Sequence, residues 1–563
     1  MDRRMIHNPI LHGFYPDPSI CRVEDDFYMV NSSFAFYPGI PVFHSTDLVN
    51  WKQITYALDR PEQLPLSPDI LSSGIFAPTI RYHNGIYYII CTNLCSNGNF
   101  IVTAEDPAGP WSDVHWIKGA EGIDPSLFWD DDGKVYYCGT VGFGKDPYIW
   151  IAEIDLISFC IINDKKLVWA GALKNCHSPE GPHLYKKNGW YYLLIAEGGT
   201  EIYHAVTIAR SRNLYGPYIG NPANPILTHR HLGQHYPICN VGHADMVELK
   251  NGSWYMVVLG SRIYGGYHKN MGRETFLVPV IWENEWPVVS PGSGKVEWTY
   301  PAPDLPISEK QQLVLRDDFV NDNLNYCWNT IGTPDHDVIK VKDSHLLIKT
   351  IARSICPSDG SNIDWMQSEN KIGGSAFLGR RQQHMCFDVR IKMFLHFQQG
   401  CESAGMIILQ NSYQSIRVEM KKVQGNRKLE VILGYIKKNF SFGLKTVAGN
   451  ANGVAANWNF QHNTGSGIYH QELIASVPWK NDDVIFKLHA DMQDYSLYAI
   501  DKRNRVTILK EHINAGFLGS ETAGGCIGEY IGMFASGNGK DVNNYAEFDC
   551  FEYLPENDNC HDP

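Results

Sequence analysis

Five segments in the N-terminal part of this 563-residue chain follow one another like copies. Each segment opens on a candidate functional residue, passes through a turn and closes on two adjacent aromatic side chains. The openers are Asp17, Ala77, Asp124, Glu180 and His243. They recur about every 45–65 residues, a spacing close to that of propeller blades. In a radial fold equivalent positions face one another across the axis, so the five openers are predicted to converge there.

The turns within these segments are hairpin signals. Asn-Gly stands at 84–85, 188–189 and 251–252, Asp-Gly at 132–133, and the first unit has Glu-Asp-Asp at 24–26. Aromatic and β-branched runs flank these turns, which favours short antiparallel strands. We therefore predict a five-bladed β-propeller over residues 1–305. The chain near Asn8 is predicted to pair with residues 282–289 and so to close the ring.

The repeat stops after a Pro-rich stretch at 300–308, which is typical of a linker. We place that linker at 306–313. Alternating strand patterns follow at 345–350, 386–392 and 416–421. They predict a β-sandwich of the jelly-roll type over residues 314–556. The last residues, 557–563, are predicted to be a frayed tail.

Composition narrows the functional classes. The net charge of −13 argues against a nucleic-acid partner, and no apolar stretch is long enough to span a bilayer. The N-terminus is basic but has no apolar core of a signal peptide, which predicts a cytoplasmic protein. The 14 cysteines are scattered and form no Cys-x-x-Cys pair, so they are expected to be reduced.

Three of the five openers, Asp17, Asp124 and Glu180, are carboxylic acids. Hydrolysis of a glycosidic bond needs one carboxylate as base and one protonated carboxyl group as acid, and a third negative charge raises the pKa of the acid. Each residue alone could simply start a strand or form a turn. Together at one blade position they would repel one another in a small volume, which favours a catalytic role.

Two further residues are candidates for this axis. His243 could lie beside a bound cation, orient a carboxylate, or be an ordinary core histidine. Arg273 could hold a sugar hydroxyl or a carboxylate through its planar fork, or form an ordinary salt bridge. The His-rich tract at 229–235 fits no standard zinc spacing and is predicted to be a polar loop.

Several motifs together resemble the family 43 glycoside hydrolases, most closely their two-domain β-xylosidase and α-L-arabinofuranosidase branch. They are Tyr-Pro-Asp-Pro-Ser-Ile at 15–20, Ser-Phe-Ala-Phe-Tyr-Pro-Gly at 33–39, His-Ser-Thr-Asp-Leu-Val-Asn-Trp at 44–51, Phe-Ala-Pro-Thr at 76–79, Glu-Gly-Pro-His-Leu-Tyr at 180–185 and Ala-Glu-Gly-Gly-Thr at 196–200. The segment at 377–384 resembles the concanavalin-like C-terminal domain of that branch.

The resemblance implies a five-bladed propeller, inversion at the anomeric carbon and release of a terminal pentose. By position, Asp17 matches the general base, Glu180 the general acid, and Asp124 the carboxylate that tunes and orients the acid. Arg273 matches an arginine that contacts the sugar. His243 matches an axial histidine often found beside a water-coordinated calcium ion.

The resemblance also implies an aromatic lining for the sugar pocket. Phe34 matches an aromatic residue of that lining, and Phe76 stands where many xylosidases of the family have Trp. The sandwich loop at 525–532, which includes Tyr530, is expected to complete the pocket, although xylosidases carry Phe in that loop. Both departures leave the choice between xylose and arabinose open.

We therefore expect an exo-acting, inverting glycosidase that releases xylose from β-1,4-xylo-oligosaccharides, with α-L-arabinofuranosidase activity as a second or even the main activity. Its partners would be xylo- or arabinoxylo-oligosaccharides and further copies of itself. No organic cofactor is expected, and a calcium ion in the propeller channel is the metal considered. More distant alternatives are a retaining fructosidase-like propeller, whose signatures do not occur here, and a non-catalytic carbohydrate-binding propeller.

Overall fold

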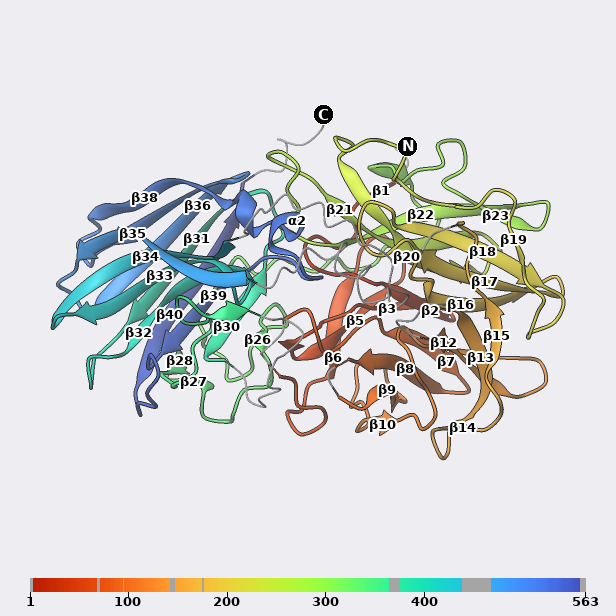
Figure 1. The fold of residues 1–563 in the computed structure, drawn as a ribbon, viewed down its shortest axis with the longest axis horizontal. Coiled ribbons are helices and arrows are strands. Elements are labelled where there is room, and N and C mark those ends of the chain that lie inside the picture. Colours follow the sequence, from red (N-terminus) through yellow and green to blue (C-terminus); the bar gives the residue numbers. More distant parts are fainter. Residues whose placement is uncertain are drawn as a thin grey trace, which may run out of the picture.

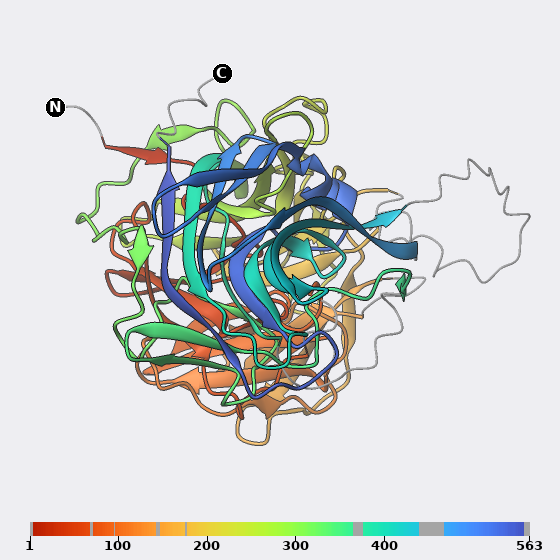
Figure 2. The same ribbon diagram turned by 90° about the vertical axis from the view of Figure 1, so that its left-hand side faces the viewer.

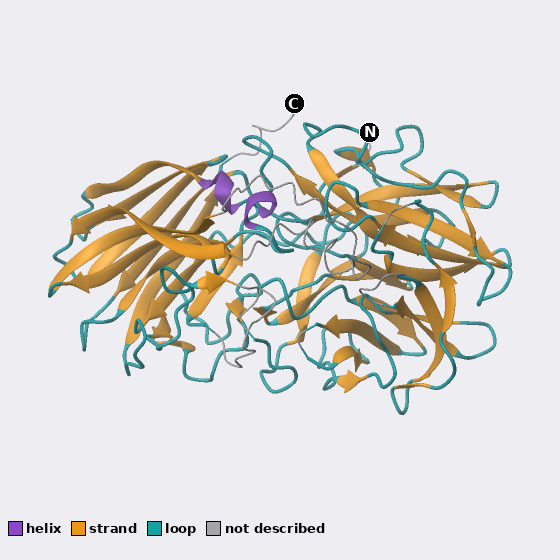
Figure 3. Ribbon diagram, viewed as in Figure 1, coloured by secondary structure: helices purple, strands orange, loops and turns teal. Residues whose placement is uncertain are grey.

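The computed structural model describes residues 4–67, 71–94, 96–141, 147–174, 177–363, 375–437 and 467–556. The described chain is almost entirely β-structure (Figure 3). Its helical elements are single turns, η1 (Ala515–Leu518) and α2 (Ser520–Ala523). None of the described helices has the length and apolarity needed to cross a membrane.

Five antiparallel sheets follow one another along the first part of the described chain. The first holds β2 (Ser19–Val23), β3 (Asp26–Val30), β5 (Gly39–Ser45) and β6 (Lys52–Leu58). The second holds β7 (Thr79–His83), β8 (Ile86–Asn93), β9 (Gly98–Ala104) and β10 (His115–Trp116). The third holds β11 (Ser126–Trp129), β12 (Val135–Thr140), β13 (Ile149–Asp155), β14 (Cys160–Ile161) and β15 (Lys166–Trp169). The fourth holds β16 (Glu180–Lys187), β17 (Trp190–Glu197), β18 (Ala205–Ser211) and β19 (Ile219–Gly220). The fifth holds β20 (Ile238–Glu248), β21 (Trp254–Arg262), β22 (Glu274–Glu283) and β23 (Trp286–Val289).

The first strands of these sheets form a closed ring. Strands β2, β7, β11, β16 and β20 contact one another in that order, and β20 contacts β2 again. This radial arrangement is that of a β-propeller, and it occupies the right-hand part of Figure 1. Each predicted unit therefore supplies one sheet, and its opener lies just before, at the start of, or within the innermost strand.

The hairpins within the blades follow from the sequence. Strands β7 and β8 pair through His83 and Ile86, which leaves Asn84 and Gly85 as a two-residue loop with φ of 49° and 86°. A type I′ turn needs positive φ at both central positions, and Asn followed by Gly meets that need with little strain. The Asn188 turn between β16 and β17 repeats this geometry.

One prediction about ring closure is wrong. The strand near Asn8, β1 (Met5–His7), pairs with β24 (Thr299–Pro301) and not with residues 282–289. Those residues already form the outer hairpin of the fifth sheet through β22 and β23. The N-terminal segment instead lies over β22, where the Asn8 side chain hydrogen-bonds both the N–H and the C=O of Leu277.

The C-terminal part of the described chain is a β-sandwich. Its first sheet holds β27 (Ile339–Lys342), β28 (His345–Lys349), β40 (Tyr545–Pro555), β31 (Cys386–Phe394), β36 (Asp483–Asp491), β37 (Asp494–Ile500) and β38 (Val506–Asn514), with β25 (Arg316–Asp317) paired to β40. Its second sheet holds β29 (Asn362–Ile363), β35 (Gly467–Pro478), β34 (Asn426–Lys437), β33 (Gln414–Val423), β32 (Ser403–Asn411), β39 (Tyr530–Ser536) and β30 (Phe377–Arg381). Apolar side chains from both sheets form one buried core. Figure 2 views the molecule from this side, with the propeller behind the sandwich.

The propeller and the sandwich contact each other through a short β-pairing and through buried hydrogen bonds. Strand β4 (Phe36–Tyr37) of the propeller pairs with β26 (Thr330–Ile331) from the chain leading into the sandwich. Arg381, fully buried in β30, donates from Nε to the carbonyl of Phe14 and from Nη1 to Asn329 Oδ1. The two domains therefore dock through paired backbone and buried hydrogen bonds.

The all-β fold class predicted from the sequence, a propeller followed by a sandwich, is confirmed. Between β24 and β25, residues 302–315 contain no strand. The predicted tail at 557–563 lies outside the described residues.

Candidate active site

The three carboxyl-bearing openers meet at the propeller axis. Asp17 and Asp124 each lie two residues before an innermost strand, and Glu180 is the first residue of β16. Asp17 and Asp124 are 5% and 6% exposed, and Glu180 is partly exposed. The charge of Asp17 acts on the pKa of both other carboxyl groups, so all three lie within electrostatic reach of one another.

The backbone at these openers has an unusual conformation. Asp17, Asp124 and His243 have φ values of 52°, 53° and 46°. The left-handed region is uncommon for residues with a Cβ, and such strain is found where function fixes a side chain. Gly181, directly after Glu180, has a φ of 57° and lets the His243 ring pack against its Cα. A positive φ at the opener, or at the residue directly after it, thus recurs in four of the five blades.

Asp17 is held ionised. Burial opposes its negative charge, but Arg273, His243 and a hydrogen bond from Ser32 outweigh burial and lower its pKa. Arg273 Nη1 donates to Asp17 Oδ1 at 2.8 Å, and Ser32 Oγ donates to Oδ2 at 2.6 Å. A buried carboxylate with these partners is a base that is charged at neutral pH.

Glu180 has the opposite character. Burial, together with the negative charge of Asp17, raises its pKa to about 8, and Arg273 only partly offsets this. Burial also raises the pKa of Asp124, with Glu180 and Asp17 adding to the effect. Asp124 and Glu180 thus favour sharing a proton, and Glu180 can donate one at neutral pH.

Arg273 joins the two domains at the site. Besides Asp17, its Nη1 donates to Thr200 Oγ1 at 3.1 Å. Its Nη2 donates to the carbonyl of Cys526 at 2.9 Å, on the sandwich loop that leads into β39. The guanidinium carbon lies 5.6 Å from the centre of the Phe34 ring. The arginine predicted to bind sugar is therefore fixed by both domains beside the base.

The predicted aromatic residues occupy two different environments. The Phe34 and Phe76 rings lie 5.3 Å apart, and Phe34 is next to Arg273. Tyr530 is fully buried and stacks on Phe36 at 3.8 Å, with its hydroxyl donating to Asn329. Phe76 is thus the only one of the three with appreciable exposed surface; Phe34 is buried behind it next to Arg273, and Tyr530 is buried within the domain interface.

His243 lies beside the base, with Nδ1 4.0 Å from Asp17 Oδ1. Burial lowers its pKa, and Arg273 adds to this effect. A calcium ion beside this histidine would need oxygen ligands, yet Asp17 Oδ1 already accepts from the Arg273 guanidinium. The side chains around His243 are therefore poorly suited to a divalent cation.

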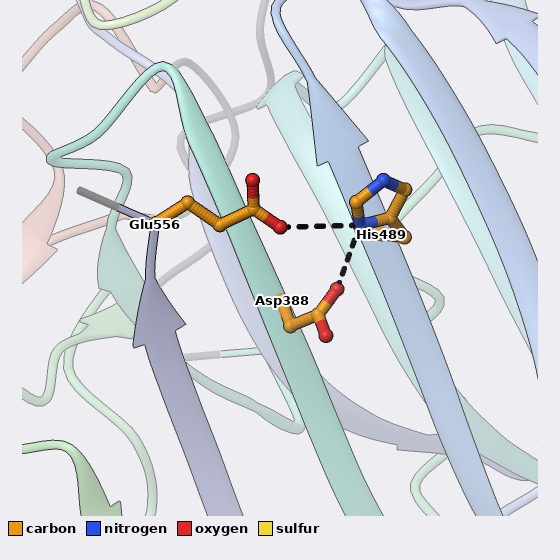
Figure 4. Close-up of side chains that lie close together, drawn as sticks. All are labelled: Asp388, His489 and Glu556. Atoms are coloured by element: carbon orange, nitrogen blue, oxygen red, sulfur yellow. Dashed lines mark hydrogen bonds and ion pairs between the residues drawn. The ribbon is translucent and has the colours of Figure 1, made fainter. Parts of the chain in front are cut away.

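A cluster of His and carboxylate ligand atoms occurs elsewhere in the described residues, on the sandwich. Asp388, His489 and Glu556 lie on or next to β31, β36 and β40, with His489 Nδ1 2.8 Å from Asp388 Oδ1 and 3.9 Å from Glu556 Oε1 (Figure 4). Lys487 Nζ lies 2.9 Å from Asp388 Oδ2 and already supplies a positive charge there. This group belongs to the sandwich and plays no part in the propeller site.

Sequence reasoning missed three contributors. Ser32 donates to the base, Thr200 accepts from Arg273, and Cys526 offers its carbonyl to the same arginine. Ser32 directly precedes the motif at 33–39, and Thr200 is the last residue of the motif at 196–200. Both residues could therefore have been proposed from the sequence. The Cys526 carbonyl could not be found, because main-chain atoms leave no signal in a sequence.

The His tract at 229–235 has a structural role, at least at its first residue. His229 is buried, with Nδ1 bonded to the carbonyl of Ile238 and Nε2 accepting from the N–H of Val296. Both of its ring nitrogens are satisfied by the main chain. Residues 229–235 form a loop that is largely exposed, as predicted, but His229 at its start is a core histidine.

A propeller axis that holds one ionised and one protonated carboxyl group defines a class of protein, the acid–base glycoside hydrolases. Residues 6–287 match the family described as Glycosyl hydrolases family 43, and residues 316–554 match the Beta xylosidase C-terminal Concanavalin A-like domain. The chain belongs to glycoside hydrolase family 43.

Relatives of similar length share both domains. The chain is 41% identical to a Xylosidase/arabinosidase of Butyrivibrio fibrisolvens, over 97% of this chain and 98% of the relative. It is 35% identical to the Non-reducing end alpha-L-arabinofuranosidase BoGH43B of Bacteroides ovatus, over 98% and 95%. Among solved structures, a xylan beta-1,4-xylosidase from Bacillus halodurans superposes with a TM-score of 0.84 at 28% identity, over 98% of this chain and all of that one.

Proposed function

We propose that this glycoside hydrolase removes terminal xylose from β-1,4-xylo-oligosaccharides with inversion, and that it also releases α-L-arabinofuranose. The observation that carries the proposal is the opposite protonation of Asp17 and Glu180 at one site. The printed names of the full-length relatives, which include xylosidase and arabinosidase, support the substrate class. The sandwich loop bonded to Arg273 would close one side of the pocket, which favours an exo mode.

In the proposed reaction Asp17 accepts a proton from a water molecule as that water attacks the anomeric carbon. Glu180 donates its proton to the glycosidic oxygen as the C–O bond breaks. The products are a free pentose of inverted configuration and a shortened oligosaccharide, with the base now protonated and the acid ionised. Proton exchange with solvent restores both groups. Each role is worth on the order of 10²–10⁴ in rate.

Other residues set the geometry for these two transfers. Arg273 keeps Asp17 ionised and has a planar fork beside it that can also hold a sugar hydroxyl. Asp124 interacts with Glu180 and helps to keep a proton on the pair. The half-buried Phe76 ring, supported from behind by Phe34, supplies an apolar face for the pentose.

A second candidate is an enzyme that acts mainly as an α-L-arabinofuranosidase. Phe76 offers less stacking surface than Trp, and the loop residue beside Arg273 is Cys526 and not an aromatic. A less crowded pocket would admit a furanose ring, and one relative carries that activity in its name.

Rates on para-nitrophenyl β-xyloside and on para-nitrophenyl α-L-arabinofuranoside decide between the two candidates. We expect activity on both, with kcat/KM for the xyloside at least equal to that for the arabinofuranoside. Proton NMR of the first-formed sugar should show the inverted anomer. Retention would favour the fructosidase-like alternative, and no turnover of either glycoside would favour a binding protein.

We further propose that the protein works in the cytoplasm as a homo-oligomer. No disulfide joins the cysteines within the described residues, which suits a reducing compartment. Cell fractionation and light scattering of the purified protein test the two statements. Recovery outside the cell, or a monomeric mass, would contradict the respective one.

A further inference from the structure

One layer below the catalytic carboxyl groups, the propeller axis holds a guanidinium group. It belongs to Arg81 on β7, in the blade whose opener, Ala77, has no polar side chain. Alternate residues of a strand face the same side, so residues 77, 79 and 81 share one face. The second blade, whose opener Ala77 has no polar side chain, thus contributes the cation Arg81 one layer further along the axis.

Arg81 reaches two other blades. Its Nη1 lies 2.8 Å from Asp245 Oδ2, and its Nη2 lies 3.2 Å from Asp245 Oδ1, so the pair is bidentate. Nη2 also donates to His183 Nδ1 at 2.9 Å. Asp245 lies on β20 and His183 on β16. One side chain therefore ties three of the innermost strands together.

The carboxylate of Asp245 has no position left for a metal ion. Beyond Arg81 it accepts from Ser19 Oγ at 2.7 Å, the Ile20 N–H at 3.0 Å, the Tyr185 hydroxyl at 2.6 Å and the Met246 N–H at 2.9 Å. The side chain is completely buried. A carboxylate has about four lone-pair sites, and these donors occupy them.

His183 and His243 are equally unsuited to a second cation. Because Arg81 can only donate, His183 Nδ1 must be unprotonated, which leaves the ring neutral with its proton on Nε2. The Arg81 charge helps to lower the pKa of His183 and the Arg273 charge helps to lower the pKa of His243, so each of these histidines has a guanidinium group close by. A divalent ion between them would meet two fixed positive charges.

We propose that Arg81 is the resident cation of the propeller channel, and that this enzyme neither holds nor needs a divalent metal there. Arg81 is a positioning residue. It acts through Asp245 and His183 on the strands that carry His243 and Glu180. The proposal does not depend on which pentose the enzyme releases.

The direct test is the metal content of the full-length protein. We expect elemental analysis after desalting to find far less than one equivalent of calcium or other divalent metal. Addition of EDTA or of calcium should leave the melting temperature and kcat unchanged. One retained equivalent, together with a lower melting temperature in EDTA, would overturn the proposal.

A variant series tests the ion pair. Arg81→Met leaves Asp245 buried and unpaired, and should lower the melting temperature by roughly 10 °C. The double variant Arg81→Met/Asp245→Asn removes both charges and should recover at least half of that loss. Arg22→Met, which removes an arginine from the outer end of β2, should change little.

The series has a result that contradicts the proposal. A double variant no more stable than Arg81→Met would show that Asp245 does not depend on the arginine charge. If Arg81→Met does not fold, the metal content of the unmodified protein and its response to EDTA decide the question alone.

Discussion

Asp17 and Glu180 are chemically similar side chains with opposite electrostatic environments at one site. Asp17 has an arginine and a serine hydroxyl as partners, whereas Glu180 has burial and the neighbouring negative charge. These environments, and not the residue types, favour the ionised form of Asp17 and the protonated form of Glu180. Two carboxyl groups whose pKa values are pushed apart are the arrangement that acid–base hydrolysis requires.

The pH profile of kcat/KM should be bell-shaped. Glu180 must be protonated to act, so activity should fall as pH rises through its pKa of about 8. Asp17 must be ionised, and because its pKa is lowered, the acid limb should lie below the ordinary range of an aspartate. Rates on an aryl xyloside across the pH range measure both limbs. If Glu180→Gln kept the activity of the unmodified enzyme and the same alkaline limb, Glu180 could not be the acid.

Removal of the Arg273 charge should shift the acid limb. Arg273→Met takes away the cation that lowers the pKa of Asp17, so the base should protonate at higher pH and the acid limb should move upward. We expect kcat/KM to fall on the order of 10²–10³. Arg22→Met serves as the matched control and should leave the profile unchanged. An acid limb that stays in place in Arg273→Met would argue against the ion pair.

At the residue scale the repeat predicted the openers because equivalent positions must converge in a radial fold. It did not predict Ser32 or the Cys526 carbonyl as partners. The contact between Arg273 and Cys526 spans 253 residues of sequence and depends on how a second domain docks. The sequence placed Tyr530 in the loop expected to complete the pocket. It is instead the first residue of β39, and its ring stacks on Phe36 in the interface between the domains.

At the scale of elements, the turns were the most predictable feature. Asn-Gly pairs fix hairpins locally, and the β7–β8 and β16–β17 connections have the expected two-residue loops. Ring closure was not predictable in the same way, because β1 and β24 come from opposite ends of the domain. Their pairing depends on the position of the whole ring.

The loop before β39 brings the sandwich to Arg273, and it packs closely against the propeller. A Cβ added at Gly528 would lie 2.4 Å from the carbonyl oxygen of Met271, two residues before Arg273. Gly528→Ala should therefore displace the loop and lower kcat/KM about tenfold. The free energy of unfolding should fall by about 1–3 kcal/mol.

Gly220→Ala is the control for that substitution, because its added Cβ would make only ordinary contacts, the nearest at 3.5 Å. Kinetics and chemical denaturation of both variants provide the comparison. Equal activity in Gly528→Ala and Gly220→Ala would show that the close approach of the loop does not matter for catalysis.

At the scale of the whole molecule, the two domains form one structure. The β4–β26 pairing, the buried Arg381 and an apolar cluster with members from both domains, including Phe34 and Tyr530, cross the boundary. The sequence predicted two domains and their classes. It could not predict this interface, because pairing between distant segments leaves no local pattern.

This docking predicts cooperative unfolding. The propeller and sandwich should melt in a single calorimetric transition, since separating them would expose the shared cluster and take the Phe14 carbonyl away from the buried Arg381. Arg381→Met should lower the melting temperature of that one transition. Two resolved transitions in the unmodified protein would show that the domains are energetically independent.

The assignment of Asp17 as base and Glu180 as acid is tested most directly by the leaving-group dependence of the two variants. Glu180→Ala should lose on the order of 10²–10⁴ in kcat/KM on xylobiose, whose leaving group needs a proton, and far less on dinitrophenyl β-xyloside, whose leaving group does not. Asp17→Ala should lose heavily on both substrates, because both need an activated water. Equal losses of Glu180→Ala on the two substrates would contradict the account.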